Sequence, residues 1–414
     1  MKNYALHIPE GVKDYIGEEA ALKELIQNKV KKVFRTNSYN LVETPSIEYL
    51  DVFTLGEESY QQTSLYHLIS RQGELMALKS DMTRSIARVI GTQKQEGAYP
   101  QRFGYLANSF RYPERYQGKL HEFTQAGVEL IGDNSMAADA EVIKIAVKCL
   151  KEIGVTDFVV HIGSSPFLEY ILEDFGFEKS QQEEVFEAID HKDAVKVKSI
   201  LKSAKIEAET LELLLELIQC SGQIALLRTV KSKMPSQRSK AAVEEMEKLY
   251  EILENYGISE HIIFDFSLMS YGKYYTGMMF QIFTLGVGAA LVEGGRYDKL
   301  LCKFGKDLPA VGFGMNINFV MQRLLKQKDL DKRQTKRTLA VSTPLTRKVC
   351  EEVCDGLRAE QVIIENSLVD DIDEALDYAK QAGLSSVMHF KSGDKVDVYD
   401  VVYGTYKETT INQL

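Results

Sequence analysis

The segment from Pro166 to Tyr256 differs in its pattern from the sequence on either side of it. It is charged and rich in leucine at helical spacing, as the run from Thr210 to Ile218 shows, and such a pattern favours helices. Strand-like runs stand before it at 158–162 and after it at 262–266 and 274–285. The pattern predicts a helical insertion at about residues 166–256, with a small core of its own, set into an α+β domain.

Other helices are expected in the first part of the chain. Apolar residues recur at helical spacing from Glu18 to Arg35, and a helix start is expected near Ser80 and Asp81. A further helix should begin at one of the capping residues 133–135 and end at Gly154. Helices therefore precede the insertion as well as forming it.

The C-terminal part of the chain is expected to be a separate domain. The chain has 414 residues, which is more than one domain usually holds. The charged stretch 326–337 predicts a linker, and residues 338–414 alternate strand-like and helix-like runs. We therefore expect a core at 1–325, a linker, and a small C-terminal α/β domain at 338–414.

Composition limits the classes of partner. The formal net charge of −10 makes a polyanion such as tRNA a less favoured partner, because a local basic patch would have to work against the overall field. No apolar targeting segment opens the chain, and no run approaches the length of a bilayer span. The five cysteines are scattered without zinc-site spacing, which predicts free thiols in a reducing cytoplasm, with Cys350 and Cys354 on one helix face.

Generic catalytic and cofactor motifs are absent from the sequence. There is no phosphate-binding loop, no complete dinucleotide fingerprint, no His-Glu-x-x-His and no Gly-x-Ser-x-Gly. The seven histidines do not cluster. Neither a cofactor nor a metal is therefore expected, and catalytic residues are not predicted.

Four segments, in order along the chain, resemble the catalytic core of histidyl-tRNA synthetase. The resemblance covers roughly residues 5 to 325 and implies a class II synthetase-like antiparallel sheet of about six strands flanked by helices. It also implies that the C-terminal domain is a shortened anticodon-binding domain. The segments are Leu78 to Thr83, Phe110 to Tyr112 with Glu122 to Gly132, Tyr274 to Gly277 with Gly294 to Asp298, and Ala310 to Met315.

Strand alternation places Gln125 and Glu129 on one face of the segment 122–131, about 13 Å apart, where they could bracket a small polar molecule. Free histidine needs acidic acceptors for its nitrogens and a basic or amide donor for its carboxylate. The resemblance implies a histidine-binding site lined by Asp81, Thr83, Arg111, Gln125, Glu129, Tyr274 and Tyr275.

Most of these residues also have a structural explanation. Asp81 would serve equally as a helix cap, and Gln125 and Glu129 would suit a solvated strand face. Tyr274 and Tyr275 point to opposite faces of a strand, so at least one should pack in the core. In the same way, Gly294 and Gly295 could simply shape a turn, and Arg296 could simply pair with a carboxylate. The ordered set of motifs, and no single residue, favours a ligand site.

The sequence departs from the synthetase at the positions that act on ATP. Ser270 and Phe319 stand where the enzyme carries arginines, and Pro113 replaces the acid that contacts adenine. Two further basic positions hold Lys119 and His121. Serine and phenylalanine cannot supply the fixed charge of a guanidinium to a reacting phosphate. The ATP half of the site is therefore expected to be lost while the histidine half is kept.

A histidine site without an ATP site resembles the regulatory subunits of short-form ATP phosphoribosyltransferase. That resemblance implies a non-catalytic, cytoplasmic subunit of histidine biosynthesis that partners a short-form catalytic subunit and senses histidine for feedback inhibition. It also implies a homodimer within a hetero-oligomer, with neither tRNA nor membrane as partner. The alternatives are an active histidyl-tRNA synthetase with an unusual active site and a paralogue that regulates another process.

Overall fold

The computed structural model describes residues 4–55, 64–92, 98–112, 120–204, 206–268, 275–326 and 337–414. The chain divides into two compact units, residues 1–327 and residues 328–414, and each unit is described by itself. Lys326 ends the last helix of the first unit and Arg337 opens the first strand of the second. The predicted linker lies almost entirely between these two residues, outside the described ranges.

A mixed sheet forms the centre of the first unit. Within the described residues it has nine strands in the order β1-β5-β6-β12-β11-β10-β7-β9-β8. The six strands from β5 to β7 are antiparallel, as predicted, whereas β1 is parallel to β5 and β9 is parallel to β7. The strands are β1 (Asn40–Leu41), β5 (Gln101–Phe110), β6 (Glu122–Ile131), β7 (Phe158–Ser164), β8 (Ser221–Gly222), β9 (Ile262–Asp265), β10 (Met278–Thr284), β11 (Val292–Arg296) and β12 (Ala310–Asn316).

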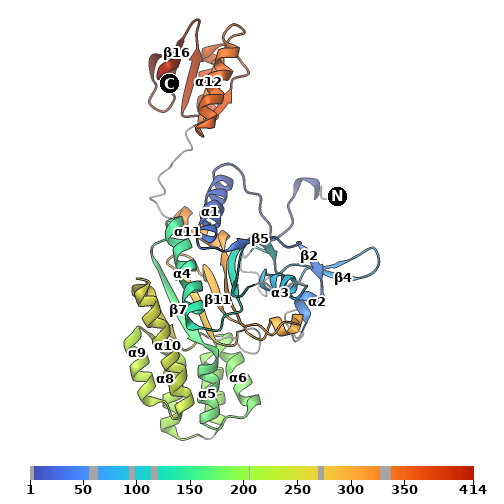
Figure 1. The fold of residues 1–414 in the computed structure, drawn as a ribbon, viewed down its shortest axis with the longest axis vertical. Coiled ribbons are helices and arrows are strands. Elements are labelled where there is room, and N and C mark those ends of the chain that lie inside the picture. The colour runs from blue at the N-terminus through green and yellow to red at the C-terminus, as the bar shows by residue number, and fades with distance from the viewer. Residues whose placement is uncertain are drawn as a thin grey trace. The chain divides into compact units, whose positions relative to one another are not determined.

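Three helices cover one face of this sheet, α1 (Gly17–Thr36), α4 (Met136–Ile153) and α11 (Ile317–Lys326) (Figure 1). Helix α1 buries a stripe that includes Ile26, Val30 and Phe34, which confirms the amphipathic helix expected there. Helix α4 begins at the N-cap Ser135 and ends at Gly154, whose left-handed backbone (φ 104°) favours glycine. Both predicted ends of α4 are therefore confirmed.

Replacing Ser135 by alanine is expected to destabilise the first unit by about 1 kcal/mol, because the Ser135 hydroxyl accepts the Ala138 N–H at 3.3 Å and alanine leaves that donor without it. Urea unfolding of the full chain measures the change. Ser232→Ala is the control. Ser232 is exposed and its hydroxyl donates to the carbonyl of Thr229, so this substitution should change stability by much less. Equal effects of the two substitutions would contradict the capping role.

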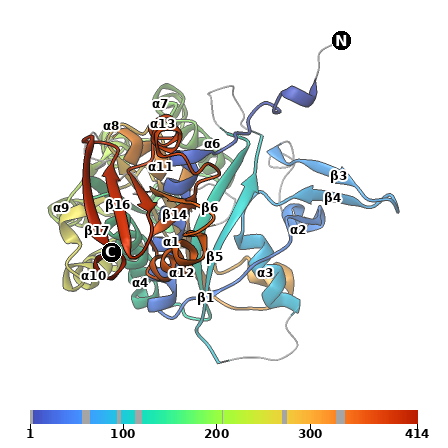
Figure 2. The ribbon, with the colours of Figure 1, turned by 90° about the horizontal axis from the view of Figure 1, so that it is seen from above.

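The opposite face of the sheet is covered at one end by α3 (Thr83–Thr92). Met82, Ile86 and Ile90 pack there against Tyr105 and Ile131 of the sheet. A small three-stranded sheet adjoins this region, and Figure 2 shows two of its strands projecting beside α2 and α3. Its elements are β2 (Ile47–Tyr49), β4 (Leu75–Leu78), β3 (His67–Ile69) and the neighbouring helix α2 (Asp51–Thr54).

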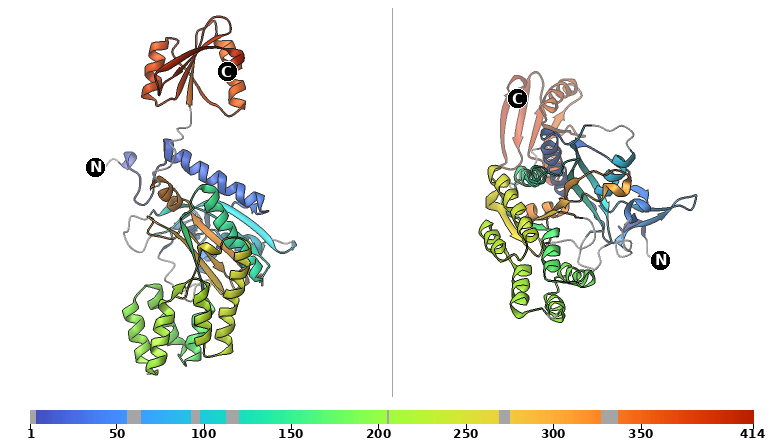
Figure 3. Two further views of the ribbon diagram at one scale, coloured as in Figure 1. Left: turned by 90° about the vertical axis from the view of Figure 1, so that its left-hand side faces the viewer. Right: turned by 60° about the horizontal axis from the view of Figure 1, so that its bottom comes forward.

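In the described part of the segment between β7 and β9 there are six helices, and Figure 3 shows them gathered at one end of the sheet. Their apolar side chains belong to the same continuous cluster as those of the sheet and of α4. The expectation of a separate small core was therefore wrong, because Phe167, Leu249 and their neighbours pack onto the main core. The helices are α5 (Ser165–Asp174), α6 (Lys179–Asp190), α7 (Ala194–Ser203), α8 (Ala208–Gln219), α9 (Ile224–Lys233) and α10 (Gln237–Asn255).

The second unit is a small α/β fold. Its described residues form a five-stranded sheet in the order β14-β13-β15-β16-β17, parallel across the first three strands and antiparallel across the last three. Cys350 and Cys354 are buried on one face of its first helix with their sulfurs 3.9 Å apart, and all five cysteines of the chain are free. The elements are β13 (Arg337–Ser342), α12 (Arg347–Ala359), β14 (Ile363–Asn366), α13 (Ile372–Gln381), β15 (Ser386–Phe390), β16 (Lys395–Asp400) and β17 (Thr405–Thr410).

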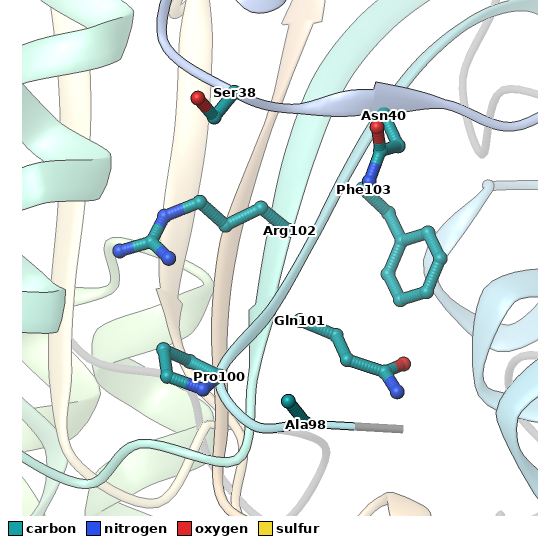
Figure 4. Close-up of a pocket in the computed structure, with 7 residues that line it drawn as sticks. All are labelled: Ser38, Asn40, Ala98, Pro100, Gln101, Arg102 and Phe103. Carbon is teal, nitrogen blue, oxygen red and sulfur yellow. The ribbon is translucent and has the colours of Figure 1, made fainter. Parts of the chain in front are cut away.

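A cavity of about 400 Å³ lies at the open edge of β5, beyond the end of β1. Figure 4 shows that the side chains of Arg102 and Gln101 point to opposite sides of the strand, so these polar groups do not converge. Glu141 also neutralises Arg102 through two hydrogen bonds of 2.7 and 2.8 Å. This edge is therefore a poor place for a charged small ligand. Among the described residues, no helix is long and apolar enough to cross a membrane.

Candidate functional site

Glu129 is the centre of the site that the sheet and α3 form together. Its side chain lies on β6 and is only 1% exposed. The hydroxyl of Thr83, the first residue of α3, donates to Oε1 at 2.7 Å. The hydroxyl of Tyr297, the residue after β11, donates to Oε2. Three segments far apart in the sequence therefore meet at one buried carboxyl group.

Glycines of the neighbouring strands make room for the side chains of the site. Gly295 of β11, Gly312 of β12 and Glu129 of β6 are register partners and share one face of the sheet. A Cβ atom at Gly312 would lie 1.8 Å from Oε2 of Glu129, and one at Gly295 would lie 2.7 Å from the ring of Tyr275. Gly314 gives the same space to Gln125, whose amide nitrogen would be 2.2 Å from the added atom. The Gly-x-Gly pattern of β12 therefore lets these side chains lie flat on the sheet.

Burial raises the pKa of Glu129 to about 8, although hydrogen bonds from Tyr297 and Thr83 favour the ionised form. The nearby Asp81 raises this pKa further. A ligand that brings a cationic nitrogen to Glu129 would offset the cost of its ionisation. The site is therefore suited to an amine or an imidazole, each of which can donate a hydrogen bond and carry positive charge.

Gln125 lies on the same face of β6 as Glu129, nearer the start of the strand. The hydroxyl of Ser109 on β5 donates to its Oε1 at 3.3 Å, while its amide nitrogen lies above Gly314. The opposite face of the strand carries Ala126 and Val128 in the core, as the alternation predicted. Gln125 can thus present an N–H donor to a ligand.

Asp81 and Arg111 form the charged side of the site. Oδ1 of Asp81 accepts the N–H of Arg84 at 3.2 Å, so Asp81 does cap the first turn of α3. Its Oδ2 lies 3.9 Å from Nη2 of Arg111, and Nε of Arg111 donates to the carbonyl of Ser80 at 2.8 Å. The guanidinium also lies 5.7 Å from the ring centre of Phe123. Capping and a place in the site are therefore compatible for Asp81.

Of the two predicted tyrosines, Tyr275 lies within the described residues. Tyr275 lies with its ring over Gly295, and burial raises the pKa of its hydroxyl. It precedes β10, which begins at Met278, so the prediction that the strand starts at 274 was wrong. Tyr274 lies outside the described residues, and its place in the site stays a prediction.

Tyr297 contacts Glu129 in the candidate site, and the sequence analysis did not identify it. It belongs to the Gly294 to Asp298 segment, whose glycines and Arg296 were considered while the tyrosine was not. Strand alternation places Tyr297 on the same face as Gly295, two residues earlier, and that signal could have found it. The carboxyl partner itself, on β6, could not be read from the local sequence.

Of the positions expected to have lost their ATP contacts, only Phe319 and His121 lie within the described residues. Phe319 is half-buried against the main core. The neighbouring Asn318 accepts the N–H of Thr124 at 2.8 Å. Nδ1 of His121 lies 2.6 Å from the hydroxyl of Tyr66. Ser270, Pro113 and Lys119 lie outside the described residues. The described residues contain no group of three side chains suited to a metal ion.

The chain is similar in sequence to proteins of known families. A model of the Histidyl-tRNA synthetase family matches residues 11–320. The ATP phosphoribosyltransferase regulatory subunit of Acetivibrio thermocellus is 33% identical over 415 residues, with 100% of this chain and 99% of that protein covered. The protein of the same name from Halothermothrix orenii is 36% identical, with 79% of this chain and 78% of that protein covered.

The chain is also similar to solved structures of proteins with these names. An ATP phosphoribosyltransferase regulatory subunit/histidyl-tRNA synthetase from Bacillus halodurans has a TM-score of 0.81 at 30% identity, covering 91% of this chain and 97% of that one. A histidyl-tRNA synthetase from Nostoc sp. PCC 7120 has a TM-score of 0.84 at 20% identity, covering 99% and 97%, and supports the fold alone. The fold and the site thus define a protein built on the histidyl-tRNA synthetase core. Within that class, the chain belongs to the family of ATP phosphoribosyltransferase regulatory subunits.

Proposed function

We propose that this chain is a non-catalytic regulatory subunit that a short-form ATP phosphoribosyltransferase catalytic subunit needs for activity, at the first step of histidine biosynthesis. The observation that carries the proposal is the likeness to proteins of that name over both units of the chain, at 33% identity and 99% of a relative's length. An isolated synthetase-like core would have matched only the first unit. The cytoplasm is the compartment in which we expect it to act.

We further propose that histidine binds at the Glu129 site. Glu129 and Asp81 would accept hydrogen bonds from the nitrogens of the ligand, while Arg111 and the amide of Gln125 would donate to its carboxylate. The cost of burying Glu129 without a partner cation supports a ligand that carries positive charge. Thr83, Tyr274 and Tyr275 complete the proposed set.

We also propose that the chain does not activate histidine with ATP. Activation of an amino acid by ATP needs fixed positive charge at the reacting phosphorus. Phe319 offers none, and its neighbour Asn318 is engaged by Tyr15 and by Thr124. Ser270 and Pro113, at two other positions where the synthetase contacts ATP, are uncharged as well. Arg111 remains, but it bonds Ser80 and faces Asp81.

Feedback would follow from differential affinity. Histidine shifts the assembly towards an inhibited state only as far as it binds that state more tightly than the active one. We propose a homodimer within a hetero-oligomer as the unit that responds, without tRNA as a partner. Mass measurement of the chain with and without the catalytic subunit tests the assembly.

Histidine-dependent pyrophosphate exchange by the purified chain is expected to be absent, whereas a mixture with the short-form catalytic subunit should show ATP phosphoribosyltransferase activity that neither chain has alone. Histidine should then inhibit the mixture. Exchange by the chain alone would favour the alternative, an active histidyl-tRNA synthetase, whose name also appears for the Bacillus halodurans relative. Absence of activity in the mixture would contradict the regulatory role.

A further inference from the structure

Arg296 is a buried cation whose donors are all used on the side of the sheet away from Glu129. Its side chain is 8% exposed. Nε and Nη2 donate to Oδ1 of Asp139 at 2.9 and 2.6 Å, and Nη2 also donates to the carbonyl of Ser135 at 3.3 Å. Nη1 donates to the carbonyl of Asp133 at 3.0 Å and to Oδ1 of Asp298 at 3.1 Å. These bonds use the five N–H groups of a guanidinium.

The partners of Arg296 fix the chain on both sides of Tyr297. Asp298 binds Arg296, and its Oδ1 also accepts the N–H of Ala310, the first residue of β12, at 3.0 Å. The N–H of Asp298 donates to the hydroxyl of Thr276 at 3.0 Å, and the N–H of Thr276 donates to the carbonyl of Arg296 at 2.7 Å. Tyr297 is thus held between two anchored residues, while its own side chain points to the Glu129 face.

We propose that Arg296 is a positioning residue for the ligand site. From the opposite face of the sheet it fixes the segment that carries Tyr297, and so determines the position of the Tyr297 hydroxyl, which donates a hydrogen bond to Glu129. Arg296 does not touch the ligand in this proposal. The inference rests on the proposed histidine site and deepens it, because it names a residue on which the affinity of that site depends. It also ties the site to Ser135, the N-cap of α4.

The alternative is that Arg296 and Asp139 form only a stabilising ion pair. A lysine at this position would keep the charge but lose the planar set of donors, so it could not hold Asp139, Asp298 and both carbonyls at once. Under the positioning proposal the Tyr297 hydroxyl then moves, and the ionised form of Glu129 loses a hydrogen bond. Under the alternative only stability changes.

The titration of Glu129 separates these two readings. The titratable groups that interact with Glu129 are Asp81, just before α3, and the hydroxyls of Tyr297, Tyr105 and Tyr275. Of these groups, Tyr297 is the one that lies in the segment anchored by Arg296. A change in the titration of Glu129 on substitution of Arg296 would therefore have to pass through the Tyr297 segment.

Arg323 provides a matched control. It is another largely buried arginine, 14% exposed, that donates to both oxygens of one aspartate, Asp157, at 3.2 and 2.6 Å. Its remaining partner is the hydroxyl of Thr284. Arg323→Lys should cost stability in the same way as Arg296→Lys, but it has no link to Tyr297.

The experiment measures two properties of the full-length chain. Carboxyl-carbon NMR of the ligand-free protein follows the titration of Glu129, assigned by its absence in E129Q, and calorimetry gives the affinity for L-histidine. Arg296→Lys is expected to raise the pKa of Glu129 and to weaken histidine binding roughly three- to tenfold, the effect of one misplaced hydrogen bond. Arg323→Lys should leave both unchanged.

Thr276→Val covers the case in which Arg296→Lys does not fold, because it removes only the hydroxyl that the N–H of Asp298 reaches. It should change both properties in the same direction by a smaller amount. An unchanged Glu129 titration in the folded variants, with stability lowered as in Arg323→Lys, would overturn the proposal. Failure of the unaltered chain to bind histidine would instead contradict the proposed function, while the ligand-free titration would still decide the role of Arg296.

Discussion

Glu129→Gln is expected to remove most of the histidine affinity of the chain and, at alkaline pH, to make the ligand-free chain more stable. The glutamine side chain keeps the shape of Glu129 and can still bond the hydroxyls of Thr83 and Tyr297. It cannot carry the charge that a cationic nitrogen would meet. Loss of a charge-assisted hydrogen bond costs about 1.5–3 kcal/mol, so the affinity should fall at least tenfold.

The stability effect follows from the raised pKa of Glu129. Its value is about 8 in the folded chain, against 4.5 for an ordinary glutamic acid. Between these two values the folded chain holds a proton that the unfolded chain has lost, so stability decreases as pH rises through this window. Above pH 8 the accumulated cost is on the order of 5 kcal/mol. Glutamine has no such cost, and its advantage over Glu129 should grow from pH 5 to pH 9.

Urea unfolding of both chains at pH 5, 7 and 9 measures this difference, and calorimetry at pH 7 measures histidine binding. Glu141→Gln is the control with the opposite sign. Burial raises the pKa of Glu141, but hydrogen bonds from Arg102 and Tyr39 outweigh it, so the pKa is lowered. Glu141→Gln should therefore lose stability at neutral pH and less in acid. Unchanged histidine affinity in Glu129→Gln would exclude Glu129 from the ligand site.

The sequence predicted which face of β6 carries the site but not how that face is covered. Alternation correctly placed Ala126 and Val128 in the core and Gln125 and Glu129 opposite them. Whether the second face was solvated or buried depended on α3 and on Tyr297, which are distant in sequence. Local patterns do not contain such contacts, and so the nearly complete burial of Glu129 could not be foreseen.

Two features of the fold were missed for a related reason. Strand β1 has two residues, and its place in the sheet depends on parallel pairing with β5 rather than on its own pattern. The helices of the insertion have charged outer faces that resemble those of an independent bundle. Their apolar faces join the main core, which only the packing against α4 and the sheet determines. In both cases the deciding partners are far away along the chain.

Gly312→Ala is expected to weaken histidine binding at least tenfold by moving Glu129, although no ligand group is removed. The added Cβ would lie 1.8 Å from Oε2 of Glu129 and 2.5 Å from the carbonyl oxygen of Val128. Atoms cannot approach so closely, and a flexible carboxylate moves more easily than a strand backbone. Glu129 should rotate and lose its bonds to Thr83 and Tyr297. Overpacking of this kind costs about 1–3 kcal/mol of stability.

Gly288→Ala is the matched control, because a Cβ atom at Gly288 meets nothing within 4 Å. It should leave both binding and stability close to those of the unaltered chain. Calorimetry with histidine and urea unfolding provide the two measurements for each variant. Normal histidine binding in Gly312→Ala would show that Glu129 need not lie flat on β12.

A double variant identifies what the added methyl group displaces. Combining Gly312→Ala with Glu129→Ala removes the carboxylate, so part of the stability lost in Gly312→Ala should return while histidine binding stays weak. The unrelieved part is the contact with the backbone of Val128. If the double variant were no more stable than the sum of its single changes predicts, the clash would lie with the strand alone. Gly312 would then matter for packing of the sheet, and the bare face of β12 would have no specific part in holding Glu129.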